Sequence, residues 1–420
     1  MHKTLTMTKT KEPATLKKAA HRGRSKQKTE LVSAERSADI AHCYGFSFIE
    51  APAVTKDDFH KTKHILGVEL SAKDEHEYDS PVIRPEEKVA LLRTYLEKGM
   101  ERWAQPVMLY YEGFVLPEGI RRKHRADKIF HLDIVDTTKS VAEAIIIKTT
   151  LEILKDEGYK NLSVRINTIG DRESMTRFCR ELAAYYRKNI NLLSPHCRQA
   201  LKKDAFDVYS CTDEKCKEIK EKAPSPISYL SEPSRQHFKE VLEYLETLHI
   251  EYVVDNNLIC HKKIWSQTAF EIRDEDAQRV IAVGSRYNGV AKRIGFRKEA
   301  GAIGVTVMYP PLRARKASGL KRRKKEQPKI YFVQLGFDAK LKSLEVIEMI
   351  RQAKVPIAQS LGRDKIGSQM QAAENSKAPY AIIMGQKEAQ ENSVIVRSMA
   401  NRSQETVSLA NLPAYLAKMK

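Results

Sequence analysis

The sequence predicts an α+β protein in which an antiparallel sheet flanked by helices is followed by a separate, smaller α/β domain. Two β-like runs, at residues 107–111 and 128–135, are joined by a polar and basic loop, which favours an antiparallel hairpin. Residues 310–328 combine prolines, a glycine and a basic run, and they predict a linker. Beyond this linker, strand patterns alternate with helix patterns, which is typical of a parallel or mixed sheet covered by helices.

Hydrophobic periodicity predicts the elements of the first block in order. Val89, Leu92, Leu96, Met100 and Trp103 recur at helical spacing, so residues 86–103 should form an amphipathic helix before the hairpin. Further helices are expected at 138–156, 172–188 and 234–248, and further strands at 162–167, near 252, and at 268–272, 279–283 and 302–308. Residues 189–232 are polar and interrupted by prolines, which predicts an irregular insertion or connecting segment.

The last block has a cleaner pattern. Strands are expected at residues 330–334, 357–359, 380–384 and 393–397, with helices at 339–352 and 365–374. The predicted domains are therefore a basic disordered tail (1–38), a first domain (39–310) that contains the irregular insertion (about 189–232), a basic linker (311–328) and an α/β domain (329–420).

Most of the positive charge lies outside the predicted domains. The chain of 420 residues carries a formal charge of +19, while residues 1–38 hold ten Lys and Arg against three Glu and residues 312–329 hold nine against one Glu. Such blocks remain solvated and are attracted to phosphate backbones without sequence preference, so RNA is the expected partner. A plain solubilising tail and a mitochondrial transit peptide are the alternatives for the N-terminal block.

Cysteine content and hydropathy indicate in which cellular compartment the protein is expected. Six scattered cysteines in a chain of this length do not form a disulfide scaffold, so a reducing, cytoplasmic location is expected. No apolar run approaches the roughly 18 residues of a membrane span, so no membrane association is expected. The spacings of Cys211 with Cys216 and of His60 with His64 provide too few ligands for a structural zinc site, so no metal is predicted.

Several motifs together resemble one known family, the class II histidyl-tRNA synthetases. The resembling segments cover about residues 40–418: 44–46 (Tyr-Gly-Phe), 49–52 (Ile-Glu-Ala-Pro), 83–86 (Ile-Arg-Pro-Glu), 130–131 (Phe-His), 167–171 (Asn-Thr-Ile-Gly-Asp), 284–290 (Gly-Ser-Arg-Tyr-Asn-Gly-Val), 336–338 (Gly-Phe-Asp) and 380–385 (Tyr-Ala-Ile-Ile-Met-Gly). The resemblance implies a class II synthetase fold with an antiparallel catalytic sheet and an anticodon-binding-like α/β domain. It also implies a homodimer that binds tRNA.

The resemblance implies an adenylation site as well, and this sequence departs from it. The family places three arginines around ATP, because guanidinium groups bind phosphate bidentately and stabilise the charge of the leaving pyrophosphate. The matching positions here are Pro117, Cys260 and Pro311. Three such losses predict weak or absent binding of ATP and histidine, although basic residues in or beside the same segments are candidate replacements.

Other family pocket positions are partly retained. They give a remnant substrate pocket of Glu86, Arg125, Asp136, Arg286 and Tyr287. Glu86 matches the family residue that contacts the α-amino group of the amino acid, and as an alternative it is an acidic first-turn residue that complements the helix dipole. Asp136 stands where the family has a longer Glu that reads the histidine ring, and Leu132 replaces the family's Gln.

We therefore expect a histidyl-tRNA synthetase-like protein that does not form the aminoacyl-adenylate and acts through tRNA or other RNA. Candidate RNA-binding residues are those of the basic run, Lys321, Arg322, Arg323, Lys324 and Lys325. Two alternatives remain open. One is an active histidine–tRNA ligase that uses ATP and Mg²⁺ with remodelled catalytic residues, and the other is a regulatory subunit of histidine biosynthesis.

Overall fold

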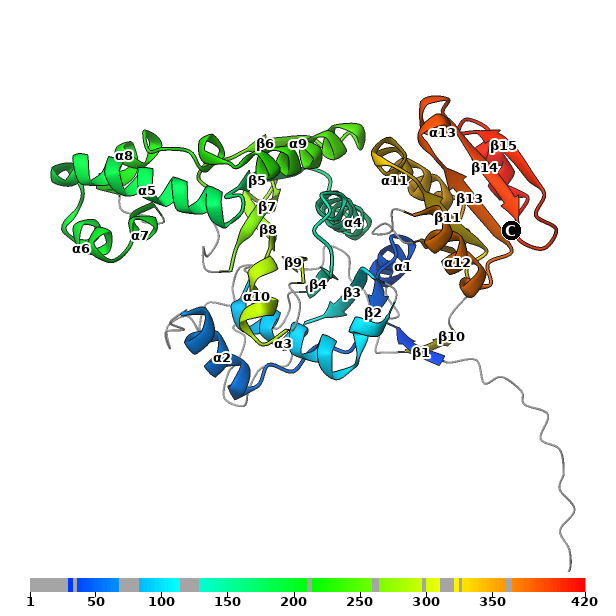
Figure 1. Cartoon of the computed structure of the whole chain (residues 1–420), viewed down its shortest axis with the longest axis horizontal. Helices are drawn as coiled ribbons and strands as arrows, with labels where there is room; N and C mark the ends of the chain where they lie inside the picture. Colours follow the sequence, from blue (N-terminus) through cyan, green and yellow to red (C-terminus); the bar gives the residue numbers. More distant parts are fainter. Residues whose placement is uncertain are drawn as a thin grey trace, which may run out of the picture.

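The computed structural model describes residues 29–32, 36–67, 83–103, 105–113, 128–209, 214–258, 264–296, 300–309, 321–324, 327–359 and 365–419. An N-terminal domain (36–309) holds a large sheet, and a C-terminal domain (327–419) holds a smaller one. In Figure 1 the C-terminal domain stands beside the large sheet, and the long helix α4 (Val141–Glu157) lies between the two.

The large sheet has eight strands in the order β2-β3-β4-β9-β8-β7-β5-β6, and all of its neighbours pair antiparallel except the outermost pair at each edge. The strands are β2 (Ser47–Phe48), β3 (Val107–Glu112), β4 (Lys128–Val135), β5 (Leu162–Thr168), β6 (Tyr252–Val254), β7 (Ser266–Asp274), β8 (Arg279–Arg286) and β9 (Ala302–Tyr309). The predicted antiparallel sheet and the pairing of β3 with β4 are confirmed.

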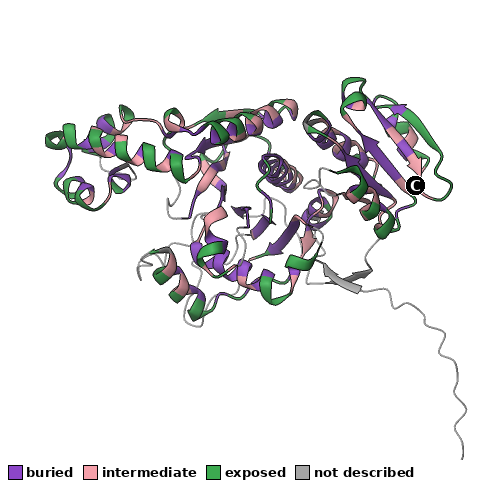
Figure 2. Ribbon diagram, in the orientation of Figure 1, coloured by how far each residue is buried: buried purple, intermediate pink, exposed green. Residues whose placement is uncertain are grey.

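Helices cover this sheet. They are α1 (Arg36–Cys43), α2 (Lys56–Leu66), α3 (Pro85–Glu97), α4, α5 (Arg172–Lys188), α9 (Glu232–Thr247) and α10 (Asn288–Arg293). The predicted helix over 86–103 ends early, because Gly99 adopts the left-handed conformation (φ +61°) and a short 3₁₀ turn, Met100–Arg102, follows it. Figure 2 shows α4 and the strands beneath it as buried, which places the core between them.

The prediction of an irregular segment over residues 189–232 is wrong. This segment contains the short helices α6 (Pro195–Lys203), α7 (Ala205–Tyr209) and α8 (Lys217–Glu221), which pack with α5 around Phe178, Leu182 and Cys197. At the far end of Figure 1 from the C-terminal domain, these helices form what we call the helical insertion (residues 190–229). Its prolines start helices instead of excluding them, since Pro195 occupies the first helical turn after Ser194.

The C-terminal domain has a five-stranded mixed sheet in the order β12-β11-β13-β14-β15. Its strands are β11 (Ile330–Gln334), β12 (Ile357–Gln359), β13 (Tyr380–Met384), β14 (Ser393–Ser398) and β15 (Gln404–Ser408), and its helices are α11 (Phe337–Gln352), α12 (Ile366–Ser376), α13 (Gln386–Gln390) and α14 (Leu412–Ala417). The predicted mixed α/β domain is confirmed, while β15, α13 and α14 were not anticipated from periodicity.

The two basic segments contain structure that the sequence did not predict. β1 (Thr29–Val32) pairs antiparallel with β10 (Lys321–Lys324), with Glu30 opposite Arg323. The predicted disordered tail is therefore wrong for residues 29–32 and for 36–38, which begin α1, and the predicted linker is wrong for 321–324. Backbone hydrogen bonds form the ladder, and a run of charged residues is compatible with a strand at a sheet edge.

The C-terminal domain contacts the N-terminal domain through α11. The Tyr44 hydroxyl donates to Glu348 Oε2 at 2.6 Å, and Arg351 Nη2 donates to Glu152 Oε2 on α4 at 3.2 Å. Arg351 also pairs with Glu348 one turn earlier on α11. Burial raises the pKa of Glu348, but hydrogen bonds from Arg351 and Tyr44 outweigh it and hold that pKa at about 2. Glu348 therefore joins the two domains as a charged acceptor.

Candidate active site

The first turn of α3 brings a buried ion pair against strands β4 and β9. Lys88 Nζ lies 2.7 Å from Asp133 Oδ1, and neither side chain has any exposed area. A buried charge is tolerated only when it is paired and hydrogen-bonded, so the pair must be satisfied on both sides.

Two tyrosines complete the shell of Asp133. The Tyr287 hydroxyl donates to Asp133 Oδ1 at 2.8 Å, and the Tyr111 hydroxyl donates to Oδ2 at 3.1 Å. The Lys88 ammonium also lies 5.4 Å from the centre of the Tyr287 ring, within the range of a cation–π contact. We call Lys88, Tyr111, Asp133 and Tyr287 the Lys88 network. Burial raises the pKa of Asp133, and Lys88 together with both hydroxyls opposes that increase.

A glycine on β9 makes room for this network. A Cβ atom at Gly304 would lie 1.9 Å from Asp133 Oδ1 and 2.7 Å from Lys88 Nζ. These distances are too short for any side chain at residue 304. The network is therefore packed directly against the backbone of β9, with no space left between them.

A second carboxyl lies next to the network. Glu87 is almost fully buried, and its Oε2 lies 4.0 Å from His131 Nδ1, whose ring stacks on Tyr111 with ring centres 4.6 Å apart. Burial, followed by the neighbouring charge of Glu86, raises the pKa of Glu87 to about 8. This carboxyl is therefore largely protonated at neutral pH.

The structure distributes the predicted pocket residues over different places. Glu86 is buried in the first turn of α3, two positions before Lys88, and Tyr287 belongs to the Lys88 network. Asp136 is exposed after β4 with φ +67°, a conformation that Asp tolerates better than most residues. Arg125 lies outside the described residues, as do Pro117, Cys260 and Pro311.

Arg286 binds groups on the side of the sheet that α4 covers. Its guanidinium binds both carboxylate oxygens of Glu143 on α4, at 2.6 and 2.7 Å, and donates to the carbonyl oxygens of Thr137 and Lys139. Burial raises the pKa of Glu143, but the charges of Arg286 and His237 outweigh this effect and hold it at about 2. All of these groups belong to the chain itself, so the described contacts give Arg286 a structural role.

The Asn-Thr-Ile-Gly-Asp motif also has a structural explanation. Asp171 caps α5 by accepting from the backbone N–H of Ser174, and its other oxygen accepts from the Ser231 hydroxyl at 2.7 Å. Gly170 has φ +70°, and a Cβ there would lie 2.6 Å from Ser174. The motif therefore connects the start of α5 to the start of α9.

The cysteine and histidine spacings noted in the sequence bring too few metal-binding side chains together for a metal site. Cys216 lies 3.4 Å, sulfur to sulfur, from Cys197 in the helical insertion, while Cys211 is outside the described residues. His60 and His64 stack on one face of α2 with ring centres 6.0 Å apart. Across the described ranges, no three His, Cys, Asp or Glu side chains are grouped as a metal site. Among the RNA-binding candidates, 321–324 form β10 and Lys325 is not described.

Sequence reasoning missed Lys88, Tyr111 and Asp133. A usable signal was present in β4, where His131 and Asp133 alternate with the apolar Phe130, Leu132 and Ile134. Alternation with a period of two places both polar side chains on one face of a strand. Because both are also fully buried, that face indicates an enclosed polar site.

Comparisons with known proteins agree along most of the chain. Residues 329–419 match the family model described as "Anticodon binding domain". Histidine–tRNA ligase of Halothermothrix orenii is 29% identical over 372 residues, covering 86% of this chain and 87% of the relative. The same enzyme of Lysinibacillus sphaericus is 26% identical over 392 residues, covering 90% and 93%.

Solved structures were compared as well. Apo histidyl-tRNA synthetase of S. aureus aligns with a TM-score of 0.49 at 23% identity, covering 90% of this chain and 93% of that one. Within the described part of this chain, no helix has the length and apolar character needed to cross a membrane. The near-complete alignment with the two ligases and the match of the C-terminal domain support the assignment of this chain to the histidyl-tRNA synthetase family, at modest identity.

Proposed function

We propose that this protein binds tRNA or another RNA without forming an aminoacyl-adenylate. The observation that carries the proposal is the Lys88 network, in which the chain's own ammonium group is buried on the element that also bears Glu86. In the family, the residue matched by Glu86 contacts the α-amino group of the substrate. Here a covalently attached ammonium is buried two positions after Glu86 on the same helix, and we infer that a substrate cation would compete with it.

Displacement of Lys88 would be costly. Its departure would leave Asp133 charged and buried, and breaking a buried ion pair by removing one partner costs about 3–5 kcal/mol. A free amino acid would have to recover this energy from its own contacts. The Lys88 network therefore disfavours histidine binding even before ATP is considered.

The sequence supports the same conclusion for ATP. Pro117, Cys260 and Pro311 replace the three arginines that the family uses, and a proline or cysteine offers no guanidinium to a phosphate. A single arginine at a phosphoryl-transfer transition state accounts for about 10³–10⁵ in rate in other enzymes. Loss of three such groups would make adenylate formation negligible.

The competing candidate is an active histidine–tRNA ligase with ATP and Mg²⁺. It is favoured by the two relatives described above, which are histidine–tRNA ligases and align over most of the chain. Histidine-dependent exchange of pyrophosphate into ATP separates the two candidates. We expect no exchange above background, with the H. orenii enzyme as the positive control; exchange comparable to that control would establish the ligase instead.

RNA binding is supported by the C-terminal domain and by the basic segments. The pairing of β1 with β10 places residues 29–32, which follow the basic N-terminal segment in sequence, beside the basic run. Phosphate contacts make affinity fall with salt, with a slope of about −0.7 to −0.9 for each contact. We therefore expect tRNA binding that weakens steeply between low and physiological salt.

A salt series with two charge-matched variants tests this expectation. Changing the basic run 321–325 to Gln should flatten the slope while preserving β10, because Gln keeps the backbone donors and acceptors of the strand. The control also removes five exposed cations, but from elsewhere: Lys160, Arg187, Lys188, Lys202 and Lys203, all to Gln. An unchanged slope in the first variant would contradict the role of the basic run, and absence of binding by the intact chain would refute RNA binding.

A further inference from the structure

The core of the helical insertion contains two cysteines whose side chains meet. Cys197 lies in the first turn of α6, and Cys216 ends the 3₁₀ turn Glu214–Cys216 that precedes α8. Their sulfur atoms lie 3.4 Å apart, although the residues are 19 positions apart in sequence. Both side chains are fully buried, and neither cysteine forms a disulfide. The fold therefore brings two reduced thiols together inside a small hydrophobic core.

The distance between the two sulfur atoms allows a disulfide to form in the folded chain. A disulfide bond is about 2.0 Å long, so the sulfur atoms have to approach each other by about 1.4 Å. Rotation about the side-chain bonds moves a sulfur atom over distances of this size. Bond formation therefore does not require the helical insertion to unfold first.

The surroundings of Cys216 favour it as the first sulfur to react. The backbone N–H of Ser194, the residue that caps α6, donates to Cys216 Sγ at 3.5 Å. Backbone donors and the N-terminus of a helix stabilise the negative charge of a thiolate, which is the reactive form of cysteine. His196 and Lys215, the chain neighbours of the two cysteines, are exposed. A small oxidant therefore has only a thin layer of protein to cross.

We propose that Cys197 and Cys216 form a redox-sensitive pair that closes into a disulfide when the folded chain meets a hydroperoxide. In the first step the Cys216 thiolate attacks one oxygen of hydrogen peroxide, an S–O bond forms, the O–O bond breaks, and the departing hydroxide takes up a proton as water. In the second step the Cys197 sulfur attacks the sulfenic acid, the S–S bond forms, and the S–O bond breaks. The departing hydroxide leaves as water with the proton of the Cys197 thiol. Two electrons pass from the thiols to the peroxide.

The disulfide stiffens the helical insertion. It joins the start of α6 to the start of α8 and closes a loop that contains α7, and such a link removes conformational freedom from the opened state. The same core contains Ile169 and Trp265, which flank strands of the large sheet, so the linked insertion remains packed on that sheet. In the reducing compartment expected from the sequence, cellular thiols return the pair to its reduced form once the oxidant is gone. The pair is therefore a reversible switch.

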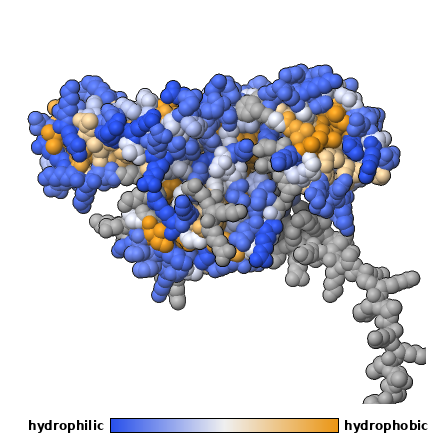
Figure 3. All heavy atoms as spheres, in the orientation of Figure 1, coloured by the Kyte–Doolittle hydropathy of each residue, from blue (hydrophilic) through white to orange (hydrophobic). Residues whose placement is uncertain are grey.

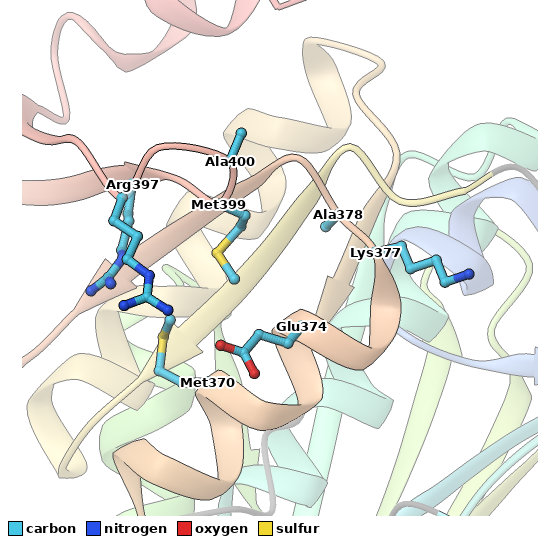
Figure 4. A pocket seen from close by; sticks show the side chains of 8 residues that line it. Met370, Glu374, Lys377, Ala378, Arg397, Met399 and Ala400 are labelled. Atoms are coloured by element: carbon cyan, nitrogen blue, oxygen red, sulfur yellow. The ribbon is translucent and has the colours of Figure 1, made fainter.

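The experiment uses the reduced full chain, which is treated with hydrogen peroxide in native buffer, alkylated and digested. Peptide mapping of the parent detects the linkage directly, so the main result does not depend on a variant that has to fold. Met370 and Met399 serve as internal standards for unselective oxidation, because the same oxidant converts methionine to its sulfoxide. Both are partly buried, and Figure 4 shows them lining a hollow of the C-terminal domain.

We expect a peptide linked through Cys197 and Cys216, lighter by two hydrogen atoms, at peroxide concentrations that leave most of the two methionines unoxidised. Dithiothreitol should remove the link. Cys197→Ala should leave a sulfenic acid at Cys216 that dimedone traps, whereas Cys216→Ala should give little dimedone adduct at Cys197. Cys179→Ala on α5 is the matched control and should form the link as the parent does. In the linked parent, the amides of α6 and α8 should exchange with deuterium about a hundredfold more slowly.

Three outcomes overturn the proposal. If Cys197 and Cys216 stay reduced while Met370 and Met399 oxidise, the pair is inert and serves only to fill the core. If Cys216 is linked to Cys211 instead, a different pair is the one that reacts. If the link forms but the exchange of α6 and α8 is unchanged, the disulfide does not stiffen the helical insertion. No RNA is present in these measurements, so none of these outcomes affects the proposed function.

Discussion

Lys88 is a buried cation whose ion pair with Asp133 occupies the space beside that carboxylate. It is fully buried, and its single ionic partner, within the described residues, is Asp133, which is 45 positions away in sequence. Asp133 in turn accepts from Tyr111 and Tyr287, so all of its strong interactions depend on groups that a ligand would have to replace. Because each member satisfies another, removal of one member is more disruptive than joint removal of the pair.

Substitution of Lys88 tests this coupling. Lys88→Met should lower the free energy of unfolding by about 3–5 kcal/mol, because Asp133 stays buried without its cation. The double variant Lys88→Met with Asp133→Asn should recover much of that loss, since no buried charge remains. Urea unfolding of the parent, both single variants and the double variant gives the coupling energy, and additive effects would contradict a closed ion pair.

Glu87 makes stability depend on pH in the opposite sense to an ordinary carboxylate. Its folded pKa of about 8 lies above the unfolded value of 4.5, so the folded state binds more protons between these values. Stability from this group is complete below pH 4.5 and is lost as the pH rises toward 8. The raised pKa of Asp133 acts in the same direction.

Comparison with Glu87→Gln isolates this effect. The urea midpoint of the parent should decrease between pH 5.5 and 8, and that of Glu87→Gln should decrease less, because Gln is neutral at both pH values. Glu143 and Glu348 do not obscure the comparison, since their pKa values of about 2 affect stability only as the pH falls below 4.5. Parallel pH profiles of parent and variant would contradict a protonated Glu87.

At the scale of elements, the segment after α1, which resembles the family's dimer-forming motif, contacts α11 of the C-terminal domain. Tyr44 follows α1 in the segment that resembles the family's dimer-forming motif, and it is fully buried. Its hydroxyl donates to Glu348 on α11, and the Gln359 side chain at the end of β12 donates to the Tyr44 carbonyl. The motif therefore also connects the two domains.

Tyr44→Phe should weaken this connection. Loss of a hydrogen bond to a charged acceptor lowers the free energy of unfolding by about 1.5–3 kcal/mol. The amides of α11 should then exchange with deuterium faster than in the parent, because the domain contact opens more often. Tyr252→Phe is the matched control, since Tyr252 donates to Glu246 on the exposed surface, where the same deletion should have little effect. Equal effects of both variants would contradict a connecting role.

At the scale of the whole molecule, the distribution of surface character bears on assembly. Figure 3 shows a mostly hydrophilic face, with the most prominent apolar patch over the C-terminal domain. The edge strand β2 lies within residues 45–52, the segment that resembles the family's dimer-forming motif, and among the described strands it pairs only with β3. An edge strand presents unpaired backbone groups to a second copy.

We therefore predict a homodimer. Light scattering across micromolar concentrations should give twice the mass of the chain, 47.9 kDa. Ala51→Asp, next to β2 and only partly buried, should shift the mass toward the monomer by introducing a charge at the contact. A Trp103→Ala variant, which shortens an exposed side chain outside residues 45–52, serves as the control. A monomeric parent at all concentrations would refute the prediction.

The sequence by itself determined the order of the elements, because periodicity is a local property. The helix at α4, the strands β4 and β9, and the alternation of the C-terminal domain follow from spacing within each segment. It also carries the prediction that the three family arginines are replaced, since Pro117, Cys260 and Pro311 are assigned from motif positions alone. The helices of the helical insertion were not predicted, because they are short and polar and contain prolines that usually mark loops.

Only the tertiary structure decided which polar groups meet. Arg286 and Tyr287 are neighbours in one motif, yet Arg286 binds Glu143, 143 positions away, while Tyr287 binds Asp133. Alternation along a strand separates their faces, but the partner on each face depends on how α4 and α3 pack against the sheet. The pairing of β1 with β10 is decided in the same way, because it joins the backbones of residues 29–32 and 321–324, which are far apart in sequence, whatever their charge.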